Sequence, residues 1–502
     1  MKNTNKHQYT DTLAPLHNAR AKTRKTVRSI FFLCGLIPML LGQFSCKKFV
    51  EIPPPITSPT AGTVFENAGT ATGAQLNIYQ AMYNNYNSYD ISSKFGGMAD
   101  ELTSYSSGYN KPYYLNAVLP NYVQPAQWAI PYNYIYQSNA VIEGLAASKT
   151  IPASIKNQLT GEALFTRALW HFYLTGWFGN IPLVTSTDYR VNGIAGRTQQ
   201  QIVYQQIVTD LQSANALLNA NYVDQTDTAI TTDRIRPNAV AALALLARVY
   251  LFEQDCVNAE AVSTKVISNS LYTLEPDLNN VFQATSREAI WQLAPPTGNT
   301  GQVTNNTLDG YEYILIAAPG TADNNSSTIS PQLIDSFEPG DHRKTSWIGT
   351  YTDTTVSPAV NYNFPFKYKV YQSLDISEYT VVLRLAEQYL IRAEARAQQG
   401  ETGGALADLN TIRHRAGLGD YAGATDKTSL LAAILHERQV ELFTEWGHRW
   451  MDLVRTKNVN AVMKVVTPQK GATWKADGHQ ALLPIPLSEI QKDNKLTQNP
   501  GY

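Results

Sequence analysis

The chain has 502 residues, of which 43% are hydrophobic and 10% aromatic, with 40 lysines and arginines against 41 aspartates and glutamates. This composition is typical of a folded protein with room for two or three domains. The near-zero net charge excludes the basic excess of a nucleic-acid-binding protein, and no acidic run suggests a charged tail.

The first 45 residues have the features of an export signal peptide. A polar, basic segment precedes an apolar run, 30–41, which is too short for a membrane-spanning helix of about 20 residues. Cys46 follows this run in the sequence SCKK, and the chain beyond it has only one further cysteine. We therefore expect lipidation at Cys46, with plain cleavage and secretion as the alternative. Four prolines between 53 and 59 make the segment 46–61 a stiff spacer before the body of the protein, 62–502.

Residues 83–136 are rich in tyrosine, asparagine, serine and glycine, and 12 of the 29 tyrosines lie between positions 79 and 136. Those between 105 and 114 follow no helical or strand period, which indicates a loop with exposed rings. Tyrosine rings stack on the apolar C–H face of a sugar and are equally suited to peptides. The alternative is a loop whose rings pack on the body. The ligand contacts predicted in this loop are Tyr105, Tyr109, Asn110 and Tyr113.

Most of the remaining chain before position 272 has the pattern of helices. Single helices are expected over 62–90, 152–178 and 198–219. The segments 237–253 and 257–270 predict a helical hairpin, and 383–416 predicts a second, related one. Small alanines at matching positions allow the two helices of each hairpin to approach closely, as in tetratricopeptide repeats. These alanines are Ala247 and Ala259 in the first hairpin, and Ala393 and Ala405 in the second.

Residues 273–377 interrupt the helical pattern. Proline, glycine, asparagine and threonine are frequent, with short strand-like pieces at 289–293 and 311–316. Long loops on a rigid frame often carry function, so we expect this insertion to bind ligand, through Arg343 and Trp347. Its acidic loops leave open a structural Ca²⁺ at Asp309 and Asp323. No other metal or cofactor is indicated.

Residues 433–455 are expected to form one long helix that carries a row of charges. Glu437, Glu441 and Glu445 recur at i+4 spacing, and Arg449 continues the row. Carboxylates beside tryptophans are compatible with an enzyme site. The arginines in this segment favour a structural ion-pair network that clamps helices together, because like charges on one face repel unless they are paired.

These segments together predict a mainly α-helical fold. It consists of a tetratricopeptide-like helical-hairpin scaffold, about 62–272 and 378–460, with few short strands. A large, loop-rich irregular insertion, about 273–377, interrupts the scaffold. The last segment, 461–502, contains several prolines and shows no helical period, so we expect an extended tail.

Five stretches of the chain resemble the SusD/RagB family of outer-membrane nutrient-binding lipoproteins of Bacteroidetes. They occur in the family's order over nearly the whole mature chain. They are SCKKFVEIPP, GEALFTRALWHFYLTGWFGNIPLV, AALALLARVYLF, the pair LRLAEQYLIRAEARAQQG and ERQVELFTEWGHRWMDLVRT, and LLPIPLSEI with the closing NPGY.

The resemblance implies a cell-surface lipoprotein of the outer membrane that binds an oligosaccharide. It also implies a SusC-like TonB-dependent transporter as partner and no catalysis. A peptide-binding RagB-like protein remains open, because the motifs belong to the scaffold rather than to the ligand site. A secreted glycoside hydrolase is the third alternative. The sequence does not exclude a pair of hydrolytic carboxylates, because such a pair has no fixed sequence motif. A zinc-dependent hydrolase is not indicated, because His436-Glu437 lacks the second histidine of a zinc-binding helix.

Overall fold

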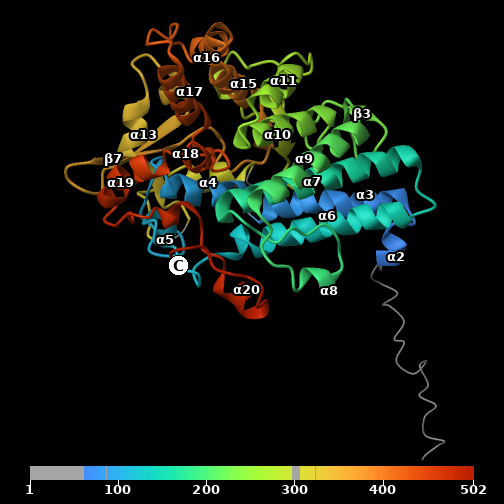
Figure 1. Ribbon diagram of the computed structural model, residues 1–502. Coiled ribbons are helices and arrows are strands. Elements are labelled where there is room, and N and C mark those ends of the chain that lie inside the picture. Colours follow the sequence, from blue (N-terminus) through green and yellow to red (C-terminus); the bar gives the residue numbers. More distant parts are fainter. Residues whose placement is uncertain (1–60, 86, 297–305, 323) are drawn as a thin grey trace, which may run out of the picture. The chain divides into compact units, whose positions relative to one another are not determined.

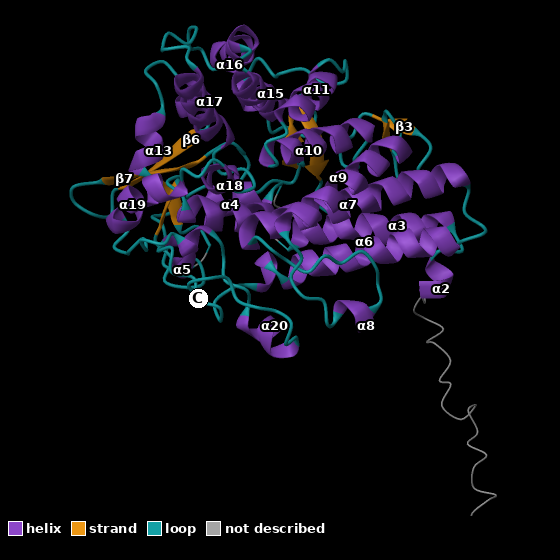
Figure 2. Cartoon of the chain, viewed as in Figure 1, coloured by secondary structure: helices purple, strands orange, loops and turns teal. Residues whose placement is uncertain are grey.

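The computed structural model describes residues 61–85, 87–296, 306–322 and 324–502 (Figures 1 and 2). The predicted signal peptide and Cys46 lie outside these residues. Within the described ranges, no helix is both long enough and apolar enough to span a bilayer.

The N-terminal part of the described chain is a set of long helices packed side by side. Helix α6 packs against α3 and α7, and α7 packs in turn against α9 (Figure 1). Nearly every side chain of α7 beyond Gln158 is buried, which is the pattern of a helix surrounded by protein on all sides. The single helices predicted over 152–178 and 198–219 are confirmed as α7 (Ala153–Phe178) and α9 (Gln200–Leu217). The helix expected over 62–90 is divided, and α3 (Ala68–Asn84) forms its main part. Helix α6 (Ala129–Ala147) lies between α3 and α7 in the sequence.

Both predicted helical hairpins are present. Helix α11 of the first packs against α15 of the second, and the matched alanines at the two crossings are all 0% exposed. Gly400 ends α15 in the left-handed conformation, with a φ of 84°, as the sequence predicts. The hairpins are α10 (Ala239–Phe252) with α11 (Cys256–Ile267), and α15 (Leu385–Gln399) with α16 (Thr402–Arg415).

The long helix expected over 433–455 is wrong. Helix α17 (Lys427–Leu442) ends before Phe443, and a separate helix, α18 (His448–Arg455), follows. The backbone between them has a positive φ at Thr444, Trp446 and Gly447. This break lets the Trp446 indole turn inward, where its Nε1 donates to the Val381 carbonyl at 2.8 Å. The chain therefore gives up about one turn of helix here, and the Trp446 side chain is buried with its N–H hydrogen-bonded.

Among the described residues the strands are few and short, as predicted, and they form four separate antiparallel pairs. In one of them, strand β4 near the start of the insertion pairs with β8, which leads directly into α15. The pairs are β1 (Leu102–Ser104) with β5 (Ser327–Ile329), β2 (Tyr222–Val223) with β3 (Ile230–Thr231), β4 (Ala289–Leu293) with β8 (Thr380–Arg384), and β6 (Ile348–Asp353) with β7 (Val360–Pro365).

Two segments differ from the predicted type. Residues 311–316 were expected as a strand, but helix α12 (Leu308–Tyr313) forms there because Thr307 caps the backbone N–H of Gly310. The tail was expected to be extended, but it contains α19 (Val459–Gln469) and α20 (Leu487–Lys492). Helix α19 buries Val459, Met463 and Val466, so its apolar side chains have a helical period after all.

The remaining helices are short, apart from α4, and connect the larger elements. They are α2 (Ala61–Val64), α4 (Asn87–Met98), α5 (Lys111–Tyr114), α8 (Tyr189–Asn192), α13 (Pro331–Ser336), α14 (His342–Ser346) and the 3₁₀ turns η2 (Pro125–Gln127), η3 (Leu278–Asn280) and η4 (His479–Ala481).

Candidate functional site

The glutamate row forms a buried ion-pair network, as its sequence favours. Glu441 Oε1 lies 2.6 Å from Nη1 of Arg384, and Glu437 Oε1 lies 2.6 Å from Nη1 of Arg343. Burial raises the pKa of the Glu441 carboxyl, but three arginines outweigh burial and hold that pKa well below its usual range. The network joins α17, α16, the insertion and the end of β8, and so clamps the scaffold to the insertion. Its further members are Glu288, Glu445, Lys367, Arg413 and Arg415.

This network contradicts the expectation that Arg343 and Trp347 face a ligand. The Arg343 side chain is 0% exposed and all its polar contacts are to acidic residues of the protein. Trp347 is also 0% exposed, and its Nε1 donates to the Leu278 carbonyl at 3.0 Å. Both residues therefore hold the insertion onto the scaffold and present no group to solvent.

Two of the four residues predicted in the tyrosine-rich loop are also buried. Tyr113 is 0% exposed, and its hydroxyl donates to Gln127 Oε1 at 3.0 Å and accepts from the backbone N–H of Gln124 at 3.2 Å. Asn110 is 8% exposed at the start of α5. The prediction of exposed contacts at these two positions is wrong, because the chain turns inward where α5 begins.

Tyr105 and Tyr109 are the exposed tyrosines of this loop, at 39% and 64% of their surface. The loop is fixed to the insertion by its backbone. The N–H of Tyr105 donates to the Ser326 carbonyl at 2.7 Å, and the N–H of Ser107 donates to the Thr321 carbonyl at 2.8 Å. The tyrosine loop is thus attached to the insertion at two points of its backbone.

The insertion contributes further tyrosines. The Tyr362 ring meets the Tyr105 ring edge-on, with 5.9 Å between centroids. Tyr362 and Tyr351 are directly opposite each other on β7 and β6, so their side chains lie on the same face of the hairpin. Gly349 leaves room for the Phe364 ring on the partner strand, because a Cβ at position 349 would lie 2.4 Å from that ring. Strand pairing therefore fixes the position of both rings.

A stacked pair completes the set. The Tyr311 and Tyr371 rings lie 5.0 Å apart at an interplanar angle of 29°. Tyr371, like Tyr351 and Tyr362, packs on a small apolar cluster that contains Ile314. We call these side chains the tyrosine surface. Its members are Tyr105, Tyr109, Tyr311, Tyr351, Tyr362 and Tyr371.

Sequence reasoning missed the four tyrosines of the insertion. The signal for one of them, Tyr362, was present in residues 361–368, NYNFPFKY, in which every second residue is aromatic. Such alternation is typical of a strand with one aromatic face. The positions of the partner strand and of Tyr311 depend on contacts that no local pattern encodes.

Two acidic residues of α12 lie beneath this surface. Burial raises the pKa of Asp309 to about 7, although a hydrogen bond from Ser88 at 3.0 Å opposes the shift. Burial also raises the pKa of Glu312 to about 7. Asp323, the other residue considered for Ca²⁺, lies outside the described residues. Among the residues that the structure describes, no three histidine, cysteine or acidic side chains converge as a metal site would require.

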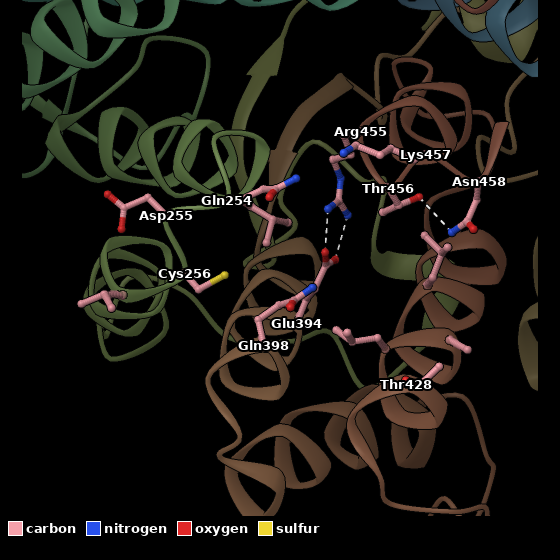
Figure 3. Close-up of a pocket in the computed structure, with 15 residues that line it drawn as sticks. Gln254, Asp255, Cys256, Glu394, Gln398, Thr428, Arg455, Thr456, Lys457 and Asn458 are labelled. Carbon is pink, nitrogen blue, oxygen red and sulfur yellow. Dashed lines mark hydrogen bonds and ion pairs between the residues drawn. The ribbon is translucent and has the colours of Figure 1, made fainter. Parts of the chain in front are cut away.

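A cleft of about 750 Å³ lies in the helical scaffold, away from the predicted contacts (Figure 3). Glu394 and Arg455 point toward each other in it and form a bidentate pair at 2.6 and 2.7 Å. Cys256 is partly exposed at its wall. The central charges of the cleft are satisfied by each other, and none of the predicted ligand contacts lines it.

Comparisons with known proteins identify the class of this fold. A family model described as "SusD family" matches residues 340–502, and one described as "Starch-binding associating with outer membrane" matches residues 48–251. A SusD-superfamily protein of Bacteroides vulgatus superposes with a TM-score of 0.74 at 20% identity, over 88% of this chain and all of that one. The chain belongs to the SusD/RagB family.

Individual relatives match this chain over different shares of their length. SusD-like protein P25 of Formosa agariphila is 24% identical over 92% of this chain and 98% of its own. The starch-binding protein SusD of Bacteroides thetaiotaomicron is 32% identical, over 28% of this chain and 23% of its own. A laminarin-binding SusD-like protein superposes with a TM-score of 0.68 at 24% identity, over 86% of this chain and 99% of that one.

Proposed function

We propose that this protein is a non-catalytic glycan-binding lipoprotein of the cell surface. In this proposal, the lipidated Cys46 anchors it in the outer membrane, facing outward, and it delivers an oligosaccharide to a SusC-like TonB-dependent transporter. Family membership supports this reading, as do the relatives that are named for binding starch and laminarin.

The observation that carries the proposal is the tyrosine surface. Tyr105 of the loop contacts Tyr362 of the insertion, and Tyr351, Tyr362 and Tyr371 pack on one apolar cluster. Tyr311 stacks on Tyr371, and backbone hydrogen bonds tie the loop that carries Tyr105 to the insertion. Rings that are held in place lose little conformational entropy when a ligand binds, which favours affinity. An apolar ring face suits the C–H face of a pyranose, and the neighbouring hydroxyls suit its polar edge.

Arg343, Trp347, Tyr113 and Asn110 have no place in this proposal as contacts, because they are buried. Tyr105 and Tyr109 remain, and Tyr351, Tyr362 and the Tyr311–Tyr371 pair join them. The ion-pair network joins the insertion to the scaffold and takes no part in ligand contact in this proposal.

A screen of the purified protein against a glycan panel and a peptide pool tests the ligand class. The proposal predicts binding to one or more oligosaccharides and recovery of the glycan intact. Selective binding to peptides would support the RagB-like alternative, and release of shortened sugars would support the hydrolase.

The anchor and the partner need separate tests. Cys46→Ala should abolish incorporation of a labelled fatty acid and release the protein from outer membranes. The wild-type protein should copurify with a TonB-dependent transporter from detergent-solubilised outer membranes. Labelling that persists in the variant, or the absence of any such transporter, would refute the corresponding part of the proposal.

A further inference from the structure

A second aromatic cleft, of about 310 Å³, lies between α6, the residues after α8, and α20. It contains no residue of the tyrosine surface. Ten of its twelve lining residues come from α6 with its N-cap, from the segment at the end of α8 and from the segment at α20, and all twelve lie outside the loop 105–114 and the insertion.

One wall of this cleft is a row of aromatic rings on α6. Trp128, Tyr132 and Tyr136 recur at i+4 spacing and so lie along one face of the helix. The Trp128 and Tyr132 rings are 5.1 Å apart, and the Tyr132 hydroxyl donates to the Pro182 carbonyl at 2.9 Å. Trp128 is 4% exposed, whereas Tyr136 is 52% exposed. The first two rings are therefore fixed in place, and the third is open to solvent beside them.

The other residues that line the cleft include charged side chains and an amide. Glu489 and Lys492 form an ion pair at 2.7 Å on α20, and Asp493 follows them. Asn192 stands at the end of α8, where its Nδ2 donates to the Ser186 carbonyl at 2.8 Å. Carboxylate and amide groups thus line the same cleft as the aromatic rings.

We propose that this cleft is a second glycan subsite, which takes a pyranose ring with its C–H face against Tyr136 and its hydroxyls toward Glu489, Asp493 and Asn192. The inference rests on the proposed function and extends it to a second point of contact on the glycan. The cleft volume is near the lower end of small-molecule sites, about 300–1,000 Å³, so it fits one or two sugar rings rather than a helix of a partner protein.

The test is the number of binding equivalents in titrations of the full-length protein, in detergent, with laminarihexaose and with maltoheptaose. The wild type should bind two equivalents of at least one of these sugars. Tyr136→Ala should lose one equivalent, through at least a tenfold loss of affinity at that site. Tyr136→Phe, which keeps the ring, should retain both. Tyr189→Ala removes a ring that is 80% exposed on α8 and outside the cleft, and should also retain both.

The outcomes separate this inference from the proposed function. A Tyr105→Ala/Tyr109→Ala double variant should lose the other equivalent and keep the one at Tyr136. Three results would overturn the second subsite alone. The first is that Tyr136→Ala still binds two equivalents, and the second is that Tyr136→Phe loses as much binding as Tyr136→Ala. The third is that the wild type binds a single equivalent, which depends on Tyr109. Binding of neither sugar by the wild type would also overturn the second subsite alone, because the proposed function is tested with the full glycan panel.

Discussion

Arg343 and Trp347 show that the type of a residue does not reveal its exposure. Both stand in a segment rich in turn-forming residues, and both are of types that often bind ligands. The acidic partners of Arg343 on α17 lie almost a hundred residues further along the chain, and the Lys367 ammonium lies 4.7 Å from the Trp347 ring centroid. Folding brings these groups together and removes both side chains from solvent.

Arg343→Ala should therefore affect stability rather than ligand binding. The substitution leaves Glu437 and Glu441 buried without one of their partners. Breaking one partner of a buried network costs about 3–5 kcal/mol. Equilibrium unfolding in urea measures this loss, and binding of glycan by the folded fraction should be unchanged.

The matched control is Arg190→Ala, since Arg190 pairs with Asp188 at the surface, where its side chain is 75% exposed. Its unfolding curve should coincide with that of the wild type. If Arg343→Ala also unfolded like the wild type but bound glycan weakly, Arg343 would be a ligand contact after all.

Asp309 makes stability depend on pH. Its pKa is about 7 in the folded protein, against about 4 in the unfolded chain. Between these values the folded state holds a proton that the unfolded state has lost, so the free energy of unfolding falls as pH rises from 4 to 7. The slope attributable to this group is at most about 1.4 kcal/mol per pH unit. Asp309→Asn removes this contribution.

The variant should therefore lose less stability than the wild type between pH 5 and pH 7 in denaturant unfolding. Glu101 and Glu312, whose pKa values burial raises to about 8 and about 7, remain in both proteins and contribute the same slope. Parallel stability curves for the two proteins would show that Asp309 does not hold its proton in the folded state.

At the scale of elements, the break between α17 and α18 could not be predicted, because the i+4 spacing of the charged residues indicates one continuous helix. Gly447 adopts a φ of 72° there, and a Cβ at this position would lie 3.0 Å from the Cβ of Phe95. Helix α4, which contains Phe95, packs directly against α18. The glycine is thus needed both for the left-handed backbone and for the close approach of α4.

Gly447→Ala should destabilise the protein more than Gly471→Ala, which is its matched control. Gly471 has a φ of 78°, but a Cβ added there would meet no other atom within 4 Å. Both substitutions incur the left-handed cost of about 1–2 kcal/mol. Only the first adds overpacking, about 1–3 kcal/mol. Equal midpoints of thermal unfolding would contradict this account of the α4 contact.

Elements with a strong period were predictable, and those fixed by single capping or contact residues were not. Helices α7, α10 and α15 follow from their apolar pattern and from glycine at the end of α15. Helix α12 depends on the Thr307 cap inside a segment whose composition indicates loops. The short α19 contains Pro468 near its end, and this proline concealed the period before it.

At the scale of the molecule, the mainly helical scaffold and the family followed from the sequence, but only part of the candidate site did. Tyr105 and Tyr109 were found because their loop has a distinct composition. The rings of Tyr351 and Tyr362 reach the same surface through the β6–β7 pairing, and Tyr311 through its contact with Tyr371. Such long-range contacts have no local signature, so the tyrosine surface needed the structure.

The central claim is that glycan binds on the tyrosine surface. Its most direct test is calorimetric titration of the glycan selected by the panel into wild type, Tyr109→Ala and Tyr189→Ala, with thermal unfolding of each protein as the folding control. Tyr109 and Tyr189 are both highly exposed, so neither substitution should unfold the chain. We predict that Tyr109→Ala weakens binding by roughly 1–3 kcal/mol, the range for aromatic stacking, and that Tyr189→Ala leaves it unchanged. Wild-type affinity in Tyr109→Ala, or an equal loss in both variants, would contradict the claim.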